Sequence, residues 1–164
     1  MFKIGELVVY PMHGAGIVQA FEVKNIDGAP RNYCVLHMPL GEMKVMLCEE
    51  SMKHINMRHI MSPDEICQIL EQVTRVKHTR TSENWSQRYK DNMERIRTGL
   101  LKESASIFYE LYCYERKKGL SGAEKKIMTT AKKIVLSEIM MAYNIEKNSA
   151  EEILESYLDR KVVE

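Results

Sequence analysis

The residues of this 164-residue chain that are best suited to a chemical role surround its single tryptophan, Trp85. The ring lies in a polar run, Thr81-Ser82-Glu83-Asn84-Trp85-Ser86-Gln87-Arg88-Tyr89-Lys90. A large flat apolar ring among phosphate-seeking side chains suits insertion into opened nucleic acid, because the ring replaces base stacking that has been lost. The competing interpretation is that Trp85 belongs to the core, since most tryptophans are largely buried.

Further cationic and polar side chains complete a set of candidate nucleic-acid contacts. The set is Trp85, Asn84, Arg88, Lys90, Lys125 and Lys126. Arg88 follows the tryptophan by three residues on one predicted helix, so the two side chains share a side of that helix. Lys125 stands in the first turn of a later helix, where free backbone N–H groups also favour anions. Lys132 and Lys133 extend this second group, and the fold decides whether the groups converge.

The net charge of +1 conceals an uneven distribution along the chain. Residues 1–75 carry 7 basic and 9 acidic groups, residues 76–133 carry 14 and 7, and residues 134–164 carry 3 and 7. The net charges of these segments are therefore −2, +7 and −4. A basic middle segment between acidic ends favours a polyanionic partner for that segment alone. Solvated lysine-rich helix faces are the alternative explanation.

Several classes of protein lack their sequence signals here. The cysteines Cys34, Cys48, Cys67 and Cys113 form no C-x-x-C pair, so we expect free thiols and no metal site. No phosphate-binding loop, nucleophile elbow or zinc-protease motif occurs, and Gly14-Ala15-Gly16 leads into a predicted strand. We therefore expect a protein that is not an enzyme and needs no cofactor. Without an 18-residue apolar run or a signal peptide, we expect it in the cytoplasm.

Residues 4–60 alternate short apolar runs with turn residues, which is typical of β-strands. The expected strands are residues 7–10, 16–21, 33–36 and 43–47. Asp27-Gly28 predicts a two-residue hairpin turn, because both central positions of such a turn need a positive φ. Four or five strands in so short a segment predict a small, strongly bent barrel or sandwich.

After residue 61 the apolar spacing becomes that of helices. Capping boxes, in which a serine and a glutamate three residues later bond each other's backbone, predict helix starts at Ser62, Ser121 and Ser149. The other expected helices span residues 83–97 and 100–118 and end at Gly99 and Gly119. The inward face of the helix after Ser121 should comprise Ile127, Ala131, Ile134, Val135, Ile139 and Ala142.

These patterns predict an α+β protein with a β module at residues 1–61, a helix and polar linker at 62–82, and an all-helical bundle at 83–164. Four motifs in this order resemble the CarD/CdnL family of bacterial transcription regulators. They are Lys3-Ile4-Gly5-Glu6-Leu7-Val8-Val9-Tyr10-Pro11-Met12-His13-Gly14, Pro39-Leu40-Gly41-Glu42-Met43-Lys44-Val45, Asn84-Trp85-Ser86-Gln87-Arg88-Tyr89-Lys90 and Lys118-Gly119-Leu120-Ser121-Gly122-Ala123-Glu124-Lys125. The resemblance spans nearly the whole chain.

The resemblance implies a Tudor-like, SH3-type β barrel that docks on the β subunit of RNA polymerase, and a helical module that reaches promoter DNA. By similarity, Trp85 would wedge into the splayed minor groove at the upstream edge of the transcription bubble and stabilise the open complex. Lys24, Lys44 and Met46 would face the polymerase. Family members often carry arginine at positions 24 and 46, so Lys24 loses the bidentate fork and Met46 loses the charge.

Two hypotheses of different class remain open at this point. In the first, the chain is a regulator, acting as a monomer, that binds polymerase and promoter DNA together, with little base specificity of its own. In the second, it is a protein–protein adaptor that captures a partner strand on the edge of its β module. The second hypothesis makes Trp85 a core residue, so the exposure of this ring distinguishes the two.

Overall fold

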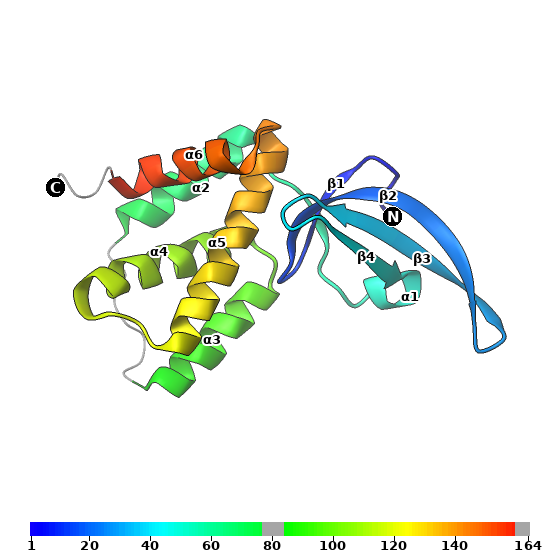
Figure 1. Ribbon diagram of the computed structural model, residues 1–164, viewed down its shortest axis with the longest axis horizontal. Helices are drawn as coiled ribbons and strands as arrows, with labels where there is room; N and C mark the ends of the chain where they lie inside the picture. Colours follow the sequence, from blue (N-terminus) through cyan, green and yellow to red (C-terminus); the bar gives the residue numbers. More distant parts are fainter. Residues whose placement is uncertain (77–83, 160–164) are drawn as a thin grey trace.

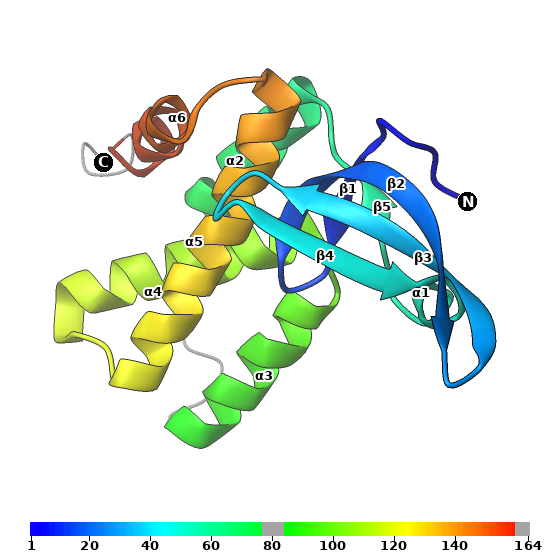
Figure 2. The same cartoon turned by 45° about the vertical axis from the view of Figure 1, so that its right-hand side comes forward.

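The computed structural model describes residues 1–76 and 84–159 (Figure 1). A β-sheet occupies the first part of the chain and helices the second, with one long helix between the sheet and the remaining helices (Figures 1 and 2). The expected α+β organisation, a small β module followed by a helical bundle, is confirmed.

The β module is a single antiparallel sheet with the strand order β4-β3-β2-β1-β5. Its strands are β1 (Leu7–Tyr10), β2 (Gly14–Ile26), β3 (Ala29–Met38), β4 (Met43–Cys48) and β5 (Arg58–His59), and a one-turn helix, α1 (Glu49–Met52), follows β4. The register of β2 and β3 shifts between Val18 and Ala20, and the sheet is strongly bent (Figure 2). Such a bulge increases local twist, which curls the sheet over its own core.

The four expected strands are present, and the Asp27-Gly28 turn has the predicted backbone, with φ of 52° and 79°. β2 and β3 extend beyond the expected limits, because the hairpin continues as a ribbon that projects away from the helices (Figure 1). The core of the β module consists of Val8, Val18, Cys34, Leu36, Met38 and Leu47. The sequence allowed a fifth strand but did not locate β5, since two residues carry no alternating pattern.

The helical bundle contains α2 (Pro63–Arg75), α3 (Trp85–Arg97), α4 (Leu101–Lys118), α5 (Gly122–Tyr143) and α6 (Lys147–Asp159). The capping boxes of Ser62 with Glu65 and of Ser121 with Glu124 are both formed, as predicted. α2 contributes Ile66, Leu70 and Val73 to the helical core, so it packs as part of the bundle. The predicted inward face of α5 is buried, except that Ala142 is half-buried.

The predicted capping box at Ser149 is wrong. Asn144 ends α5 in the left-handed conformation, with φ of 52° and ψ of 55°. The reversal of direction leaves a short connection, and the next helix begins at Lys147, with the Ala150 N–H donating to the Glu146 carbonyl. Ser149 therefore lies inside the first turn of α6 and is exposed.

The sheet and the bundle are joined around a carboxylate on α5. The Glu138 side chain is fully buried and forms a bidentate ion pair with Arg58 of β5, at 2.7 Å from Nη1 to Oε1 and 2.8 Å from Nη2 to Oε2. Glu138 Oε1 also accepts from the Met61 backbone N–H, and Arg58 Nε donates to the Gly99 carbonyl at 2.9 Å. We call these groups the junction; they connect β5, the start of α2, the α3–α4 turn and α5.

A second contact brings the backbone of β2 directly against α5. The Ala15 N–H donates to Ser137 Oγ at 2.8 Å, and that hydroxyl donates to the Ile134 carbonyl at 2.7 Å. Gly14 lies so close that an added Cβ would overlap Ser137 Oγ, and its φ of 98° also disfavours other residues. Gly14, the last residue of the first of the four motifs, therefore permits the close approach of the two modules.

Replacing Glu138 by glutamine should destabilise the protein by about 3–5 kcal/mol, because Arg58 would keep a largely buried charge without its counter-ion. Urea unfolding at neutral pH measures this change, with the exposed Glu152→Gln as the control. The double variant Arg58→Met with Glu138→Leu should recover much of the loss, since both charges are removed together. A loss below about 1 kcal/mol for Glu138→Gln would contradict the importance of this pair.

Candidate functional site

Trp85 is the first residue of α3, and 60% of its surface is exposed. The Asn84 side chain caps the helix by accepting from the Ser86 backbone N–H at 3.0 Å, which fixes where the ring emerges. In both views α3 begins at the end of the bundle that lies away from the sheet (Figures 1 and 2). The interpretation of Trp85 as a core residue is therefore wrong, and the ring is available to a partner.

An open groove of about 610 Å³ lies beside this ring. We call it the Trp85 groove; its lining residues are Met12, Trp85, Tyr89, Met93, Gly122, Ala123, Lys126, Ile127 and Thr130. They come from α3, from the first turns of α5 and from the β1–β2 turn. Tyr89 is 38% exposed, so the groove presents two partly exposed aromatic rings one helical turn apart.

Arg88 lies at the back of this surface instead of projecting from it. Its Nη2 and Nε lie 2.8 and 3.0 Å from Glu124 Oε1, and the two side chains are only 12% and 5% exposed. Glu124 also caps α5 through Ser121. The sequence placed Arg88 among the phosphate contacts, but in the structure its guanidinium forms an ion pair with the buried Glu124 carboxylate. We therefore interpret Arg88 as the residue that fixes α3 against the start of α5.

Two opposing effects act on the Glu124 carboxyl. Burial by itself raises its pKa, but the hydrogen bonds from Arg88 and from the Ser121 backbone outweigh burial, so the pKa lies below its ordinary value of about 4.5. A depressed folded pKa means that the ionised group stabilises the fold. That stabilisation is complete above pH 4.5 and is lost as the pH falls through the lower pKa of the folded state.

A second set of ion pairs holds α3 against α4. Arg95 Nε lies 2.7 Å from Glu103 Oε2, and Arg95 Nη1 lies 3.1 Å from Glu110 Oε2. With the Arg88–Glu124 pair, these contacts fix α3 at both of its ends. Sequence reasoning did not single out Arg95, Glu103 or Glu110. The available signal was that these charged residues lie within segments predicted to be helices with a buried apolar face.

The predicted basic residues converge only in part. Lys126 lines the Trp85 groove, and Lys90 borders a small adjoining cavity together with Tyr89 and Met93. Lys125 is exposed on the first turn of α5. Lys132 and Lys133 instead line a different groove, with Phe108 and Tyr112 of α4. The continuous basic surface along α5 that the sequence indicated is therefore divided between two faces of the bundle.

The residues expected to face polymerase lie on the outer part of the sheet. Lys24 Nζ lies 3.4 Å from Met46 Sδ, so these side chains meet across β3. Lys44 is exposed and is two residues from Met46, so it shares that face of β4. Arg31 pairs directly with Lys24 in the β2–β3 register and is also exposed. Sequence reasoning missed Arg31, although counting outward from the Asp27-Gly28 turn would have paired it with Lys24.

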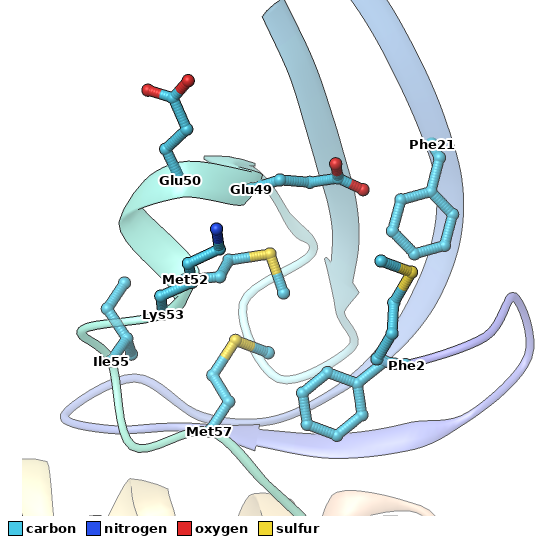
Figure 3. Close-up of a pocket in the computed structure, with 9 residues that line it drawn as sticks. Phe2, Phe21, Glu49, Glu50, Met52, Lys53, Ile55 and Met57 are labelled. Atoms are coloured by element: carbon cyan, nitrogen blue, oxygen red, sulfur yellow. The ribbon is translucent and has the colours of Figure 1, made fainter.

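An apolar cavity of about 510 Å³ lies beside the same sheet, where α1 follows β4 (Figure 3). Phe2, Phe21, Met52, Ile55 and Met57 point toward it, and Glu49 lies at its rim (Figure 3). Its lining comes from the chain start, β2, α1 and the segment before β5. No motif predicted this cavity, because its residues are brought together only by the bend of the sheet.

Within residues 1–76 and 84–159, no three His, Cys, Asp or Glu side chains form a group suited to a metal ion. Among the described helices, none is long and apolar enough to cross a membrane. The four cysteines are free thiols, as expected.

The fold and the exposed surfaces define a two-module protein in which a bent antiparallel sheet is joined, through a buried ion pair, to a helical bundle that presents an aromatic groove. The model of the CarD-like/TRCF RID domain matches residues 2–61, and that of the CarD C-terminal domain matches residues 65–155. The chain therefore belongs to the CarD/CdnL family of transcription factors. A curated relative from Bacillus subtilis (strain 168), named "Putative transcription factor YdeB", is 33% identical over 139 residues, which cover 85% of this chain and 90% of the relative.

Replacing Glu124 by glutamine should lower stability at neutral pH by about 1.5–3 kcal/mol, the usual value of hydrogen bonds to a charged group. The difference from the wild type should shrink as the pH falls below 4.5, because the wild-type carboxyl then becomes protonated as well. Urea unfolding between pH 7 and pH 3 provides the measurement, with the exposed Glu94→Gln as the control. A difference that stays constant over this range would show that Glu124 acts through packing alone.

Proposed function

We propose that this protein binds the β subunit of bacterial RNA polymerase through its sheet and promoter DNA through the Trp85 surface, and thereby slows the collapse of the open promoter complex. The observation that carries the proposal is the exposure of Trp85, at 60%, on a helix that ion pairs hold at both ends. An exposed rigid ring beside cations suits DNA that has already been opened. The protein would act in the cytoplasm, as a monomer on each polymerase.

The DNA-binding side of the proposal rests on charge and on shape. Lys90, Lys125 and Lys126 are exposed near the ring and suit phosphate contacts. Asn84 would act indirectly, by fixing the start of α3, because its side chain already accepts from Ser86. Phosphate contacts and ring stacking carry little information about base identity, so binding should depend little on base sequence. Promoter choice would then come from the polymerase.

The polymerase-binding side rests on the family of the sheet module and on its free edge. β4 is the outermost strand of the sheet, and Lys44 and Met46 lie on it. An outer strand offers backbone groups to which a partner strand can be added, while side chains beside it supply specificity. Lys24 and Arg31 place two cations next to this edge, so an acidic partner surface is favoured.

The lifetime of open complexes on an unstable promoter tests the proposal directly. Wild-type protein should prolong the lifetime, and Trp85→Ala should lose roughly tenfold or more of that effect, since unstacking energies are of the order of a few kcal/mol. Because the ring is exposed, the variant should lose less than about 1 kcal/mol of stability. Leu100→Ala, another exposed apolar residue of the bundle, is the matched control.

The open-complex lifetime measured with Trp85→Ala also tests the adaptor hypothesis. A Trp85→Ala variant that melts like the wild type and still prolongs the lifetime would remove DNA wedging from the mechanism and leave the adaptor role. Loss of the effect with unchanged polymerase affinity would place the function in the Trp85 surface.

Replacing Arg31 by alanine should weaken binding to the polymerase β subunit about threefold to tenfold, mainly through slower association. The effect should be larger at low salt, because it arises from long-range attraction between exposed charges. Binding kinetics on immobilised polymerase at two salt concentrations provide the measurement, and Lys147→Ala, on α6 of the bundle, is the control. Equal losses for both variants would mean that overall charge, and not the face of Lys24 and Arg31, attracts the polymerase.

A further inference from the structure

We propose that the Trp85 groove is a receptor for one unstacked nucleobase of the opened DNA, held beside the Trp85 and Tyr89 rings with its phosphate near Lys126. The inference rests on the proposed function and deepens it. A wedge needs only a ring that enters the stack, whereas a receptor also needs a cavity next to that ring. The structure contains both.

The size of the groove fits a small planar ligand. Its volume of about 610 Å³ lies within the range of roughly 300–1,000 Å³ that is usual for small-molecule sites. Gly122 and Ala123 line the groove where α5 begins, and space remains there because Gly122 has no side chain and Ala123 has a single methyl group. A Cβ added to Gly122 would meet no atom within 4 Å, so the space beside it is open.

The lining has the chemistry that a nucleobase requires. Trp85 and Tyr89 offer aromatic surfaces for stacking, and every base has a face that can stack. Met12 and Met93 supply adaptable apolar walls that accept rings of different outline. The Thr130 hydroxyl can both donate to and accept from the edge of a base. One hydroxyl does not distinguish four bases, so the receptor should accept any of them.

Charge favours a nucleotide over an apolar peptide as the occupant. Lys126 is exposed at the groove, and within residues 1–76 and 84–159 no ion pair holds its ammonium group. Lys90 borders the adjoining cavity, and Lys125 is exposed on the same turn of α5 as Lys126. Glu124, the nearest carboxylate on α5, is buried against Arg88, so its charge is compensated. Glu94 and Arg97 also line the adjoining cavity, and their opposite charges offset each other. Lys126, Lys90 and Lys125 therefore leave a positive balance at the mouth of the groove, as a phosphate requires.

The two mechanisms differ in what they predict for a missing base. If Trp85 acts only as a wedge, removing a base lowers the cost of opening the stack, so binding is unchanged or tighter. If the groove holds a base, removing that base leaves the groove empty and binding weakens. A nucleotide without a base therefore separates the receptor from the wedge.

The experiment measures binding of the full-length protein to forked DNA in which each unpaired nucleotide near the fork, on either strand, is replaced in turn by an abasic one. We expect one position at which the replacement weakens binding by about tenfold, the usual order for one stacked base. An adenine analogue, 2-aminopurine, at that position should lose fluorescence on binding the wild type, because stacking on an aromatic ring quenches it.

Filling the groove provides the matched variant. Gly122→Leu places a side chain in the open space, and the backbone of Gly122, unlike that of Gly119, has no positive φ that would disfavour leucine. The variant should lose both the abasic effect and the quenching, while its affinity for fully paired duplex stays within about twofold. Thr130→Met serves as a second filling variant, and Ser149→Leu adds the same bulk on α6, away from the groove.

Three outcomes overturn the receptor. They are equal or tighter binding of every abasic fork, an abasic effect that persists in both filling variants, and quenching that survives in Gly122→Leu. The proposed function would remain intact in each case, provided that Trp85→Ala still shortens open-complex lifetimes. If Trp85→Ala binds every fork as the wild type does and leaves the lifetimes unchanged, the receptor and the proposed function fail together.

Discussion

A carboxylate with no exposed surface determines how the two modules of this protein meet. Removing Glu138 from water is costly, and the forked guanidinium of Arg58 and the Met61 backbone N–H compensate for it. These partners come from segments that precede the bundle in sequence, so the compensation exists in one relative placement of sheet and bundle. An apolar contact tolerates small slides, whereas a bidentate ion pair does not. The junction therefore contributes geometric definition as much as stability.

A second buried ion pair lies at the opposite end of the bundle. Arg88 and Glu124 form this pair, and Glu124 is at the same time the capping residue of α5. The exposed Trp85 ring is thus connected through α3 to the start of α5, and through α5 to the junction at Glu138. One long helix therefore links the Trp85 surface to the sheet, because α5 packs against both modules (Figure 2).

Local signals in the sequence predicted much of this fold, and tertiary contacts account for the differences. The Ser62 and Ser121 capping boxes and the Asp27-Gly28 turn were predicted correctly, because each depends on a few adjacent residues. The start of α6 was wrong, because the reversal at Asn144 outweighs the cap at Ser149. The role of Arg88 could not be read from the sequence, since a cation beside a tryptophan looks the same whether its partner is a phosphate or a buried carboxylate. Only the fold brings Glu124 to it.

A binding protein shifts an equilibrium only by its difference in affinity for the two states. Phosphates are present in closed and open DNA alike, so the proposed contacts from Lys90, Lys125 and Lys126 would raise affinity without favouring either state. Stacking surfaces become available only when the bases separate, so in the proposed mechanism the aromatic rings would supply the difference. That difference acts on the bubble only if the rings are held where the bubble ends, because a loosely tethered ring would contact opened DNA anywhere within its reach. The buried ion pair at Glu138 is therefore as much a part of the proposed activity as the exposed tryptophan.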